Sequence, residues 1–186
     1  MIKNDFPLQT AKMLIWSVAY RIMCLVVSVS LIALINNKIG LIVAQCFCLA
    51  IFLVLPYIRM YDYGSNDVNR INYGHIKRDE LKGLKIGLIV MIPYAIFAFF
   101  LLLSHLGVIA PSFFSLYRVV NSPFFCLSQT LLPPTLTATE QNLFAVILSM
   151  ATVVCEPIVY GMGYRFGLAR IAFTTETGIY KGKKKV

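Results

Sequence analysis

Two opposite charges lie inside stretches of sequence that are otherwise apolar. Arg21 lies in the stretch 13–35, and Glu156 lies in the stretch 143–162. A lone charge at membrane depth costs at least about 2.5 kcal/mol, so each residue needs a partner or a route to water. Counted from the ends of their stretches, both lie roughly 10–12 Å below the same membrane surface. We therefore predict that Arg21 and Glu156 pair and lock the first apolar stretch against the last.

A different arrangement of these charges leads to a different function. Arg21 can extend along its stem to the lipid head groups, leaving Glu156 protonated or lining a cavity. The Pro157 that follows frees a backbone carbonyl one turn earlier. A carboxylate beside a broken helix is typical of ion sites in transporters. The two charges thus carry two hypotheses: a structural lock, or the charge centre of a small transporter or channel.

The segment 59–83 holds other side chains that could do chemistry, namely Asp62, Asp67, His75, Asp79 and Glu80. His75 and Asp79 are separated by three residues, not by the four of the membrane acyltransferase signature. The chain has no phosphate-binding Gly-rich loop with Lys and Ser or Thr and no His-Glu-x-x-His motif, and its five cysteines lack zinc spacing. We expect no catalytic set, no metal and no cofactor. A lipid-modifying enzyme that uses His75 or Asp79 is the third hypothesis.

The composition indicates a membrane protein with one domain over residues 1–186. Hydrophobic residues make up 59% of the chain and charged residues 13%, about half of the ~25% in a soluble domain. A spanning helix needs about 20 mostly apolar residues, and four such stretches occur. The expected all-α fold has spans at 13–35, 39–58, 84–104 and 143–162, a loop at 59–83, an outer segment at 105–142 and a tail at 163–186.

The outer segment contains two further apolar pieces that are too short to cross a bilayer. Asn121-Ser122-Pro123 interrupts them, with Ser122 suited to cap a helix and Pro123 suited to its first turn. Pro133-Pro134 ends the second piece. We expect a pair of short interfacial or re-entrant helices. The alternative is a fifth span over 110–132, which would bury Arg118.

The distribution of Lys and Arg predicts the orientation. With four spans, all of the 17 basic residues except Lys38 and Arg118 lie on one side. Basic residues concentrate in cytoplasmic loops, so we expect both termini and the loop 59–83 in the cytoplasm. The net charge of +9 then reflects contact with anionic lipid head groups rather than with nucleic acid.

The predicted cytoplasmic face carries two small-residue motifs and a set of polar side chains. Gly83-x-x-x-Gly87 and Gly163-x-x-x-Gly167 have a spacing that lets helix backbones approach closely, so we expect contact between the third and fourth spans or with a partner. The candidate partner-docking residues are His75, Lys77, Arg78, Asp79, Lys82, Lys85 and Arg165.

Parts of this face resemble a known group of proteins. The matching residues are Gly74-His75-Ile76-Lys77, Asp79, Leu81 to Gly87, Gly163-Tyr164-Arg165 and the Tyr180-Lys181 tail. They are similar to motifs in uncharacterised small multi-pass integral membrane proteins of Gram-positive bacteria. The resemblance implies a bacterial plasma-membrane location and brings no activity with it.

The leading functional hypothesis is a non-enzymatic accessory or scaffold subunit of a larger membrane complex. A charged loop, a basic tail and two small-residue motifs share one predicted face, which could dock another membrane protein or a second copy of the chain. The transporter or channel hypothesis relies instead on Glu156, Arg21 and the segment 111–132.

Overall fold

The computed structural model describes residues 5–35, 37–109, 113–132 and 138–169, and all regular structure within these ranges is helical. The elements are α1 Phe6–Leu34, α2 Lys38–Asn72, α3 Lys82–His105, α4 Phe113–Val120, the 3-10 turn η1 Ser122–Phe124, α5 Phe125–Leu131, η2 Ala138–Glu140, α6 Leu143–Ala151, η3 Thr152–Val154 and α7 Cys155–Ala169. Four segments are long and apolar enough to cross a membrane: Phe6–Leu34, Ile39–Asn72, Lys82–His105 and Leu143–Ala169. This confirms the expected all-α membrane fold.

Three expected features fall outside the described residues. They are the basic tail from Lys181 to Lys185, the start of the segment 111–132, and the stop at Pro133-Pro134.

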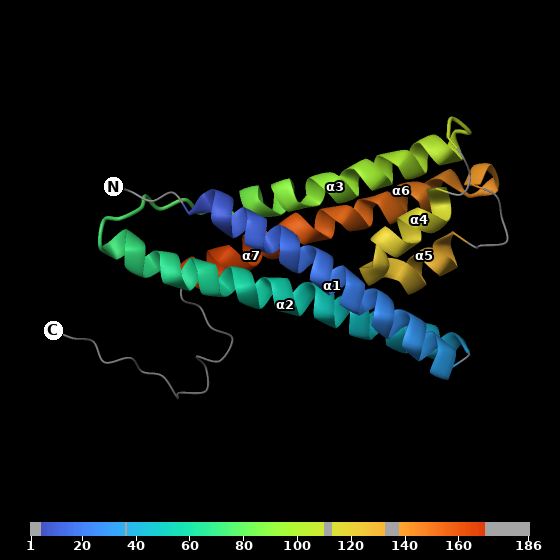
Figure 1. Cartoon of the computed structure of the whole chain (residues 1–186), viewed down its shortest axis with the longest axis horizontal. Coiled ribbons are helices and arrows are strands. Elements are labelled where there is room, and N and C mark those ends of the chain that lie inside the picture. The colour runs from blue at the N-terminus through green and yellow to red at the C-terminus, as the bar shows by residue number, and fades with distance from the viewer. Residues whose placement is uncertain (1–4, 36, 110–112, 133–137, 170–186) are drawn as a thin grey trace.

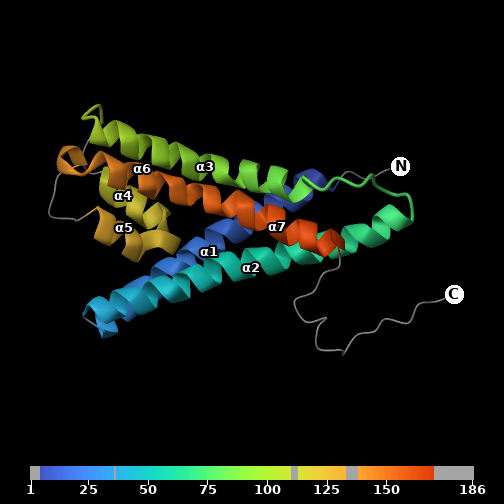
Figure 2. The same cartoon turned by 180° about the vertical axis from the view of Figure 1, so that it is seen from behind.

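The four long helices form two pairs that lie close together at one end and diverge at the other. Figures 1 and 2 show α1 beside α2, and α3 beside the continuous run of α6 and α7. The short helices α4 and α5 fill the wedge between the pairs at the diverging end, which we call the hairpin end (Figure 1). α1 begins and α7 ends toward the opposite end (Figure 1).

The helices extend beyond the apolar stretches that identified them. α1 begins at Phe6 rather than near residue 13, and α7 ends at Ala169 rather than near residue 162. Hydropathy marks where a helix leaves apolar surroundings, whereas the helix itself continues until its backbone hydrogen bonding is interrupted.

The largest correction concerns the segment 59–83, because α2 continues through it as a helix as far as Asn72. The true terminator is Gly74, which adopts a left-handed φ of 71°. Gly74 N donates to Ile71 O at 2.9 Å, and His75 N donates to Arg70 O at 2.9 Å. These two bonds form the Schellman motif that closes many helices. Within the segment 59–83, the connection 73–81 is the part that lacks helical structure.

The expectation of a loop is therefore wrong for residues 59–72. Gly64 serves helix packing instead, since a Cβ atom added there would lie 2.9 Å from Leu168 N of α7. The absence of a side chain lets the two helix backbones touch. We call α2 residues 59–72 together with the connection 73–81 the platform. Its helical part is about 20 Å long.

The two small-residue motifs pack α7 between α2 and α3. A Cβ atom at Gly87 of α3 would lie 2.5 Å from Pro157 Cα, and one at Gly83 would lie 2.6 Å from Tyr160 O. Gly163 and Gly167 face the other way: a Cβ atom at Gly163 would lie 2.6 Å from Tyr57 O of α2. The two motifs thus do not meet each other, although the third span does contact the fourth.

The short helices form a re-entrant hairpin, with its tip around residues 121–124 packed among the spans. Gln45 of α2 holds this tip from both sides: its Nε2 donates to Pro123 O at 2.9 Å, and its Oε1 accepts from Leu127 N at 2.9 Å. Asn121 Nδ2 donates to Thr152 Oγ1 at 2.9 Å. Irregular backbone at membrane depth is stable only when protein groups satisfy it in this way. At eight and seven residues, α4 and α5 are each too short to span.

Candidate functional site

Arg21 and Glu156 meet inside the bundle, at the tip of the re-entrant hairpin. Arg21 Nη2 lies 2.7 Å from Glu156 Oε2, and the two residues are 5% and 1% exposed. Arg21 comes from the middle of α1 and Glu156 from the first turn of α7. Arg21 therefore turns inward to a carboxylate rather than outward to the membrane surface.

The Glu156 carboxylate is surrounded by hydrogen-bond donors. Ser17 Oγ and Tyr160 OH both donate to Oε1, the latter at 3.0 Å, while Arg21 donates to Oε2. Ser17 Oγ also lies 3.2 Å from the Tyr94 hydroxyl. Three donors thus surround one carboxylate, and Arg21 and Glu156 form an ion pair within a polar network.

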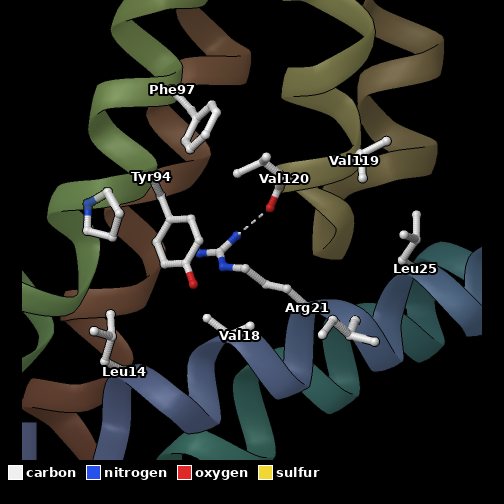
Figure 3. A pocket seen from close by; sticks show the side chains of 10 residues that line it. Leu14, Val18, Arg21, Leu25, Tyr94, Phe97, Val119 and Val120 are labelled. Carbon is white, nitrogen blue, oxygen red and sulfur yellow. Dashed lines mark hydrogen bonds between the residues drawn. The ribbon is translucent and has the colours of Figure 1, made fainter. Parts of the chain in front are cut away.

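The Arg21 guanidinium is held by an aromatic face and by the hairpin. Its Cζ lies 3.4 Å from the centroid of the Tyr94 ring, and its Nη1 donates to Val120 O at 3.3 Å (Figure 3). Ser122 Oγ in turn donates to Arg21 O at 2.5 Å. Arg21 Nε is buried and has no hydrogen-bond partner among the described residues. The ion pair and the hairpin tip therefore position each other.

A groove runs along the outside of this site, between α1, α3 and the end of α4. It measures about 440 Å³ and has Arg21 as its one charged lining residue among those described. The apolar lining is supplied by α1 from Leu14 to Leu25, by Phe97 of α3 and by Val119 (Figure 3). We call it the lateral groove.

A second buried cation lies in the hairpin. Arg118 is 7% exposed, its Nη2 donates to Leu132 O, and its Cζ lies 4.5 Å from the centroid of the Phe114 ring. Burial lowers the pKa of this guanidinium, because desolvation penalises the charged form. Burial likewise raises the pKa of the neighbouring Tyr117 hydroxyl, which donates to Ser149 O at 2.8 Å. Arg118 is thus buried within the four-span fold, without a fifth span.

Asp67, a platform residue that is 1% exposed, connects the platform to the neighbouring helices. Asp67 Oδ2 lies 2.6 Å from Lys82 Nζ and accepts from Tyr164 OH at 2.8 Å. Arg70 Nη1 lies 3.7 Å from Asp67 Oδ1 and 2.5 Å from Asp5 Oδ2. These contacts, which we call the Asp67 cluster, tie the platform to α3, to α7 and to the residue that precedes α1.

The candidate docking residues divide into two groups. Lys82 belongs to the buried Asp67 cluster, whereas the others are exposed or half-buried. Lys85 Nζ pairs with Asp79 Oδ2 at 2.7 Å, and Arg78 pairs with Glu80 at 2.8 Å. The side chains of His75, Lys77 and Arg165 are exposed.

Sequence reasoning missed most partners of the charge pair, although a helical register could have suggested two of them. Ser17 precedes Arg21 by four residues, and Tyr160 follows Glu156 by four, so each lies on the same helix face as its charged neighbour. Tyr94 carried no such signal, because its contact joins α3 to α1 across 77 residues.

Comparisons with known proteins find no matching family model, no similar curated protein and no similar solved structure. Within the described ranges, no group of three or more His, Cys, Asp or Glu side chains could hold a metal ion. The geometry offers a buried ion pair tied to a re-entrant hairpin, a lateral groove beside it, and a braced polar platform.

Proposed function

We propose that this chain is a non-enzymatic accessory or scaffold subunit of a larger membrane complex and that it docks its partner on the platform. The proposal places the chain in a bacterial plasma membrane, with both termini and the platform in the cytoplasm. The bias of Lys and Arg toward that face supports this orientation, and contact with anionic lipid head groups follows from it.

The observation that carries the proposal is the continuation of α2 beyond its apolar stretch as a braced helix. A loop of mixed charges would change shape freely, and ordering it on binding would cost conformational entropy. Here the Asp67 cluster fixes the helix against its neighbours, and the Schellman motif at Gly74 fixes the start of the connection. A preorganised surface of this kind favours a docking role.

The exposed side chains of the platform suit a partner with an acidic surface. His75, Lys77 and Arg78 follow each other closely in the connection, and all three are exposed. The pair of Arg78 with Glu80 has both side chains about half exposed or more, at 62% and 46%. Exposed pairs contribute only about 0–1 kcal/mol, so a partner's carboxylates could replace Glu80 at little cost.

The test is affinity purification from native membranes in mild detergent, with the charges of the platform reversed. We expect a stoichiometric partner to co-purify with the wild-type chain and to be lost from the Lys77→Glu, Arg78→Glu variant. Lys12→Glu is the matched control, because Lys12 is an exposed cation on α1 outside the platform. A homogeneous homo-oligomer with no other partner, or equal recovery from all three chains, would overturn the proposal.

A second candidate function, transport, is favoured by the contact between the ion pair and the hairpin. Arg21 is hydrogen-bonded to Val120 O and through its own carbonyl to Ser122. A change in the charge of Glu156 would thus shift Arg21 and, through these two hydrogen bonds, the hairpin tip. This candidate predicts that Glu156→Gln abolishes flux in vesicles, whereas Tyr160→Phe, which keeps both charges, preserves it. Flux unchanged by Glu156→Gln in a folded protein would exclude it.

A further inference from the structure

We propose that Lys12, Trp16 and Arg59 form a binding site for the phosphate of an anionic phospholipid of the phosphatidylglycerol type. The site lies at the edge of the platform, on the side where α2 meets α1. The inference rests on the proposed placement of the chain in a membrane and not on the docking of a partner.

Arg59 is held in place by aromatic side chains of α1. Its Cζ lies 4.6 Å from the centroid of the Trp16 ring, and the Tyr20 hydroxyl lies close to the same guanidinium. The Trp16 and Tyr20 rings are stacked, with their centroids 5.7 Å apart. A guanidinium that rests on an aromatic face keeps the N–H groups at its edge for a phosphate, which can accept two of them. Arg59 is exposed, so a ligand can reach this edge.

Both cations of the site lack a carboxylate partner. Lys12 precedes Trp16 by four residues, so it lies on the same face of α1, and it is exposed. The ion pairs among the described residues involve neither Lys12 nor Arg59. Asp62 is the nearest acid along α2, but it lies about 4.5 Å further from the apolar stretch than Arg59 does. The site therefore presents uncompensated positive charge to an anion.

The position of the two cations indicates a lipid phosphate rather than a phosphate in solution. Lys12 directly precedes the apolar stretch 13–35, and Arg59 directly follows the stretch 39–58. Both therefore lie at the level of the head groups, where tryptophan rings also concentrate. Trp16 and Met23 lie on one face of α1 and are 38% and 40% exposed, so an acyl chain attached to that phosphate can extend along them.

The same two charges favour an anionic head group over a zwitterionic one. Phosphatidylcholine carries a quaternary ammonium group, which Lys12 and Arg59 repel. Phosphatidylglycerol has no cation and carries a net negative charge. A basic residue close to anionic lipid strengthens binding by about fivefold.

The experiment uses the fluorescence of Trp16, which is the only tryptophan of the chain and therefore reports from this site alone. The full chain is placed in phosphatidylcholine vesicles, in which part of the lipid is replaced by a lipid brominated close to its ester groups. Bromine quenches tryptophan fluorescence on contact. We expect brominated phosphatidylglycerol to bind beside Trp16 about fivefold more tightly than brominated phosphatidylcholine. Inorganic phosphate added to the vesicles should not reduce this quenching.

Neutral substitution of the cations provides the second readout. Arg59→Gln should remove most of the preference for phosphatidylglycerol and leave quenching by brominated phosphatidylcholine unchanged, and Lys12→Gln should lower the preference as well. The matched control is Arg165→Gln, because Arg165 is an exposed cation that shortly follows the apolar stretch 143–162 on a different helix, α7. It should keep the full preference.

Three results would contradict the proposal. Equal quenching of the wild-type chain by the two brominated lipids would overturn it. A preference that Arg165→Gln lowers as much as Arg59→Gln would indicate general attraction of anionic lipid to a basic surface instead of a site. Displacement by inorganic phosphate would identify a site for free anions and overturn the assignment to lipid. The vesicles contain no partner protein, so the proposed docking function is tested separately.

Discussion

Replacing Glu156 by Gln is the most informative test of the buried ion pair. The substitution keeps the shape of the side chain and an oxygen that can accept from Ser17 and Tyr160. It removes the charge that faces Arg21, leaving a guanidinium that is 5% exposed without a counter-ion. Breaking a buried pair on one side costs about 3–5 kcal/mol, so we expect unfolding free energy to fall by that amount.

The hydrogen bonds around the pair should contribute much less than its charges. A side-chain hydrogen bond typically contributes about 0.5–1.5 kcal/mol. Tyr160→Phe, which removes one donor to Glu156 within α7, should therefore cost about 1 kcal/mol. The contrast between the two substitutions separates the effect of charge from that of hydrogen bonding.

The double substitution Arg21→Met with Glu156→Gln completes the cycle. Because it leaves no uncompensated charge, it should be more stable than Glu156→Gln alone, with a coupling energy of about 2 kcal/mol or more. The assay is equilibrium unfolding in mixed micelles with increasing sodium dodecyl sulfate, followed by far-UV circular dichroism. Additivity of the two single substitutions to within about 0.5 kcal/mol would refute the direct pair.

Exchanging the two charges should not restore stability. The carboxylate site is lined by the donors Ser17 and Tyr160, whereas the guanidinium site presents the Tyr94 ring and the Val120 carbonyl oxygen. A Glu at position 21 would face an acceptor and the negative face of a ring. Failure of the exchange therefore does not count against the pair, and the double substitution to neutral residues is the decisive measurement.

Three further substitutions test the packing around the site. Gly163→Leu places its Cβ 2.6 Å from a carbonyl oxygen of α2. It should lower the unfolding free energy by about 1–3 kcal/mol in the same assay. Gly161→Leu is the control and should be tolerated, because its Cβ would lie 3.4 Å from its nearest neighbour, Leu84 Cβ. Asp67→Asn should speed tryptic cleavage within the connection 73–81, because it removes the carboxylate that pairs with Lys82. The control is Asp62→Asn, since Asp62 is exposed. Equal cleavage of the two variants would contradict the role of Asp67 in holding the platform. Gln45→Leu removes both hydrogen bonds to the hairpin tip and should raise amide hydrogen exchange in α5, and unchanged protection there would count against the clamp.

The existence of the four spans could be predicted because it depends on composition over local stretches. A helix in a bilayer satisfies its own backbone hydrogen bonds, so about 20 apolar residues suffice to define it. The same local logic placed Arg21 and Glu156 at similar depth. Depth follows from counting residues along each helix, and counting requires no knowledge of the neighbours.

The expectation of a loop where α2 continues, at residues 59–72, has a different origin. Gly, Ser, Asn and Asp are typical turn residues, and the sequence offers no local sign that these ones are helical. Gly64 is required by the approach of the α7 backbone, and Asp67 is required by Lys82 and Tyr164, both distant in sequence. Tertiary contacts of this kind override local preference.

By itself, the sequence determined the number of spans and the presence of opposite charges, Arg21 and Glu156, at similar depth in the first and last of them. The tertiary structure decided that Gly163 faces α2 rather than α3, that the hairpin tip reaches Arg21, and that Arg21 Nε is buried without a partner among the described residues. The physical reason is the range of the interactions. Hydropathy and backbone hydrogen bonding act within a few residues, whereas helix faces are chosen by packing between segments that the sequence places far apart.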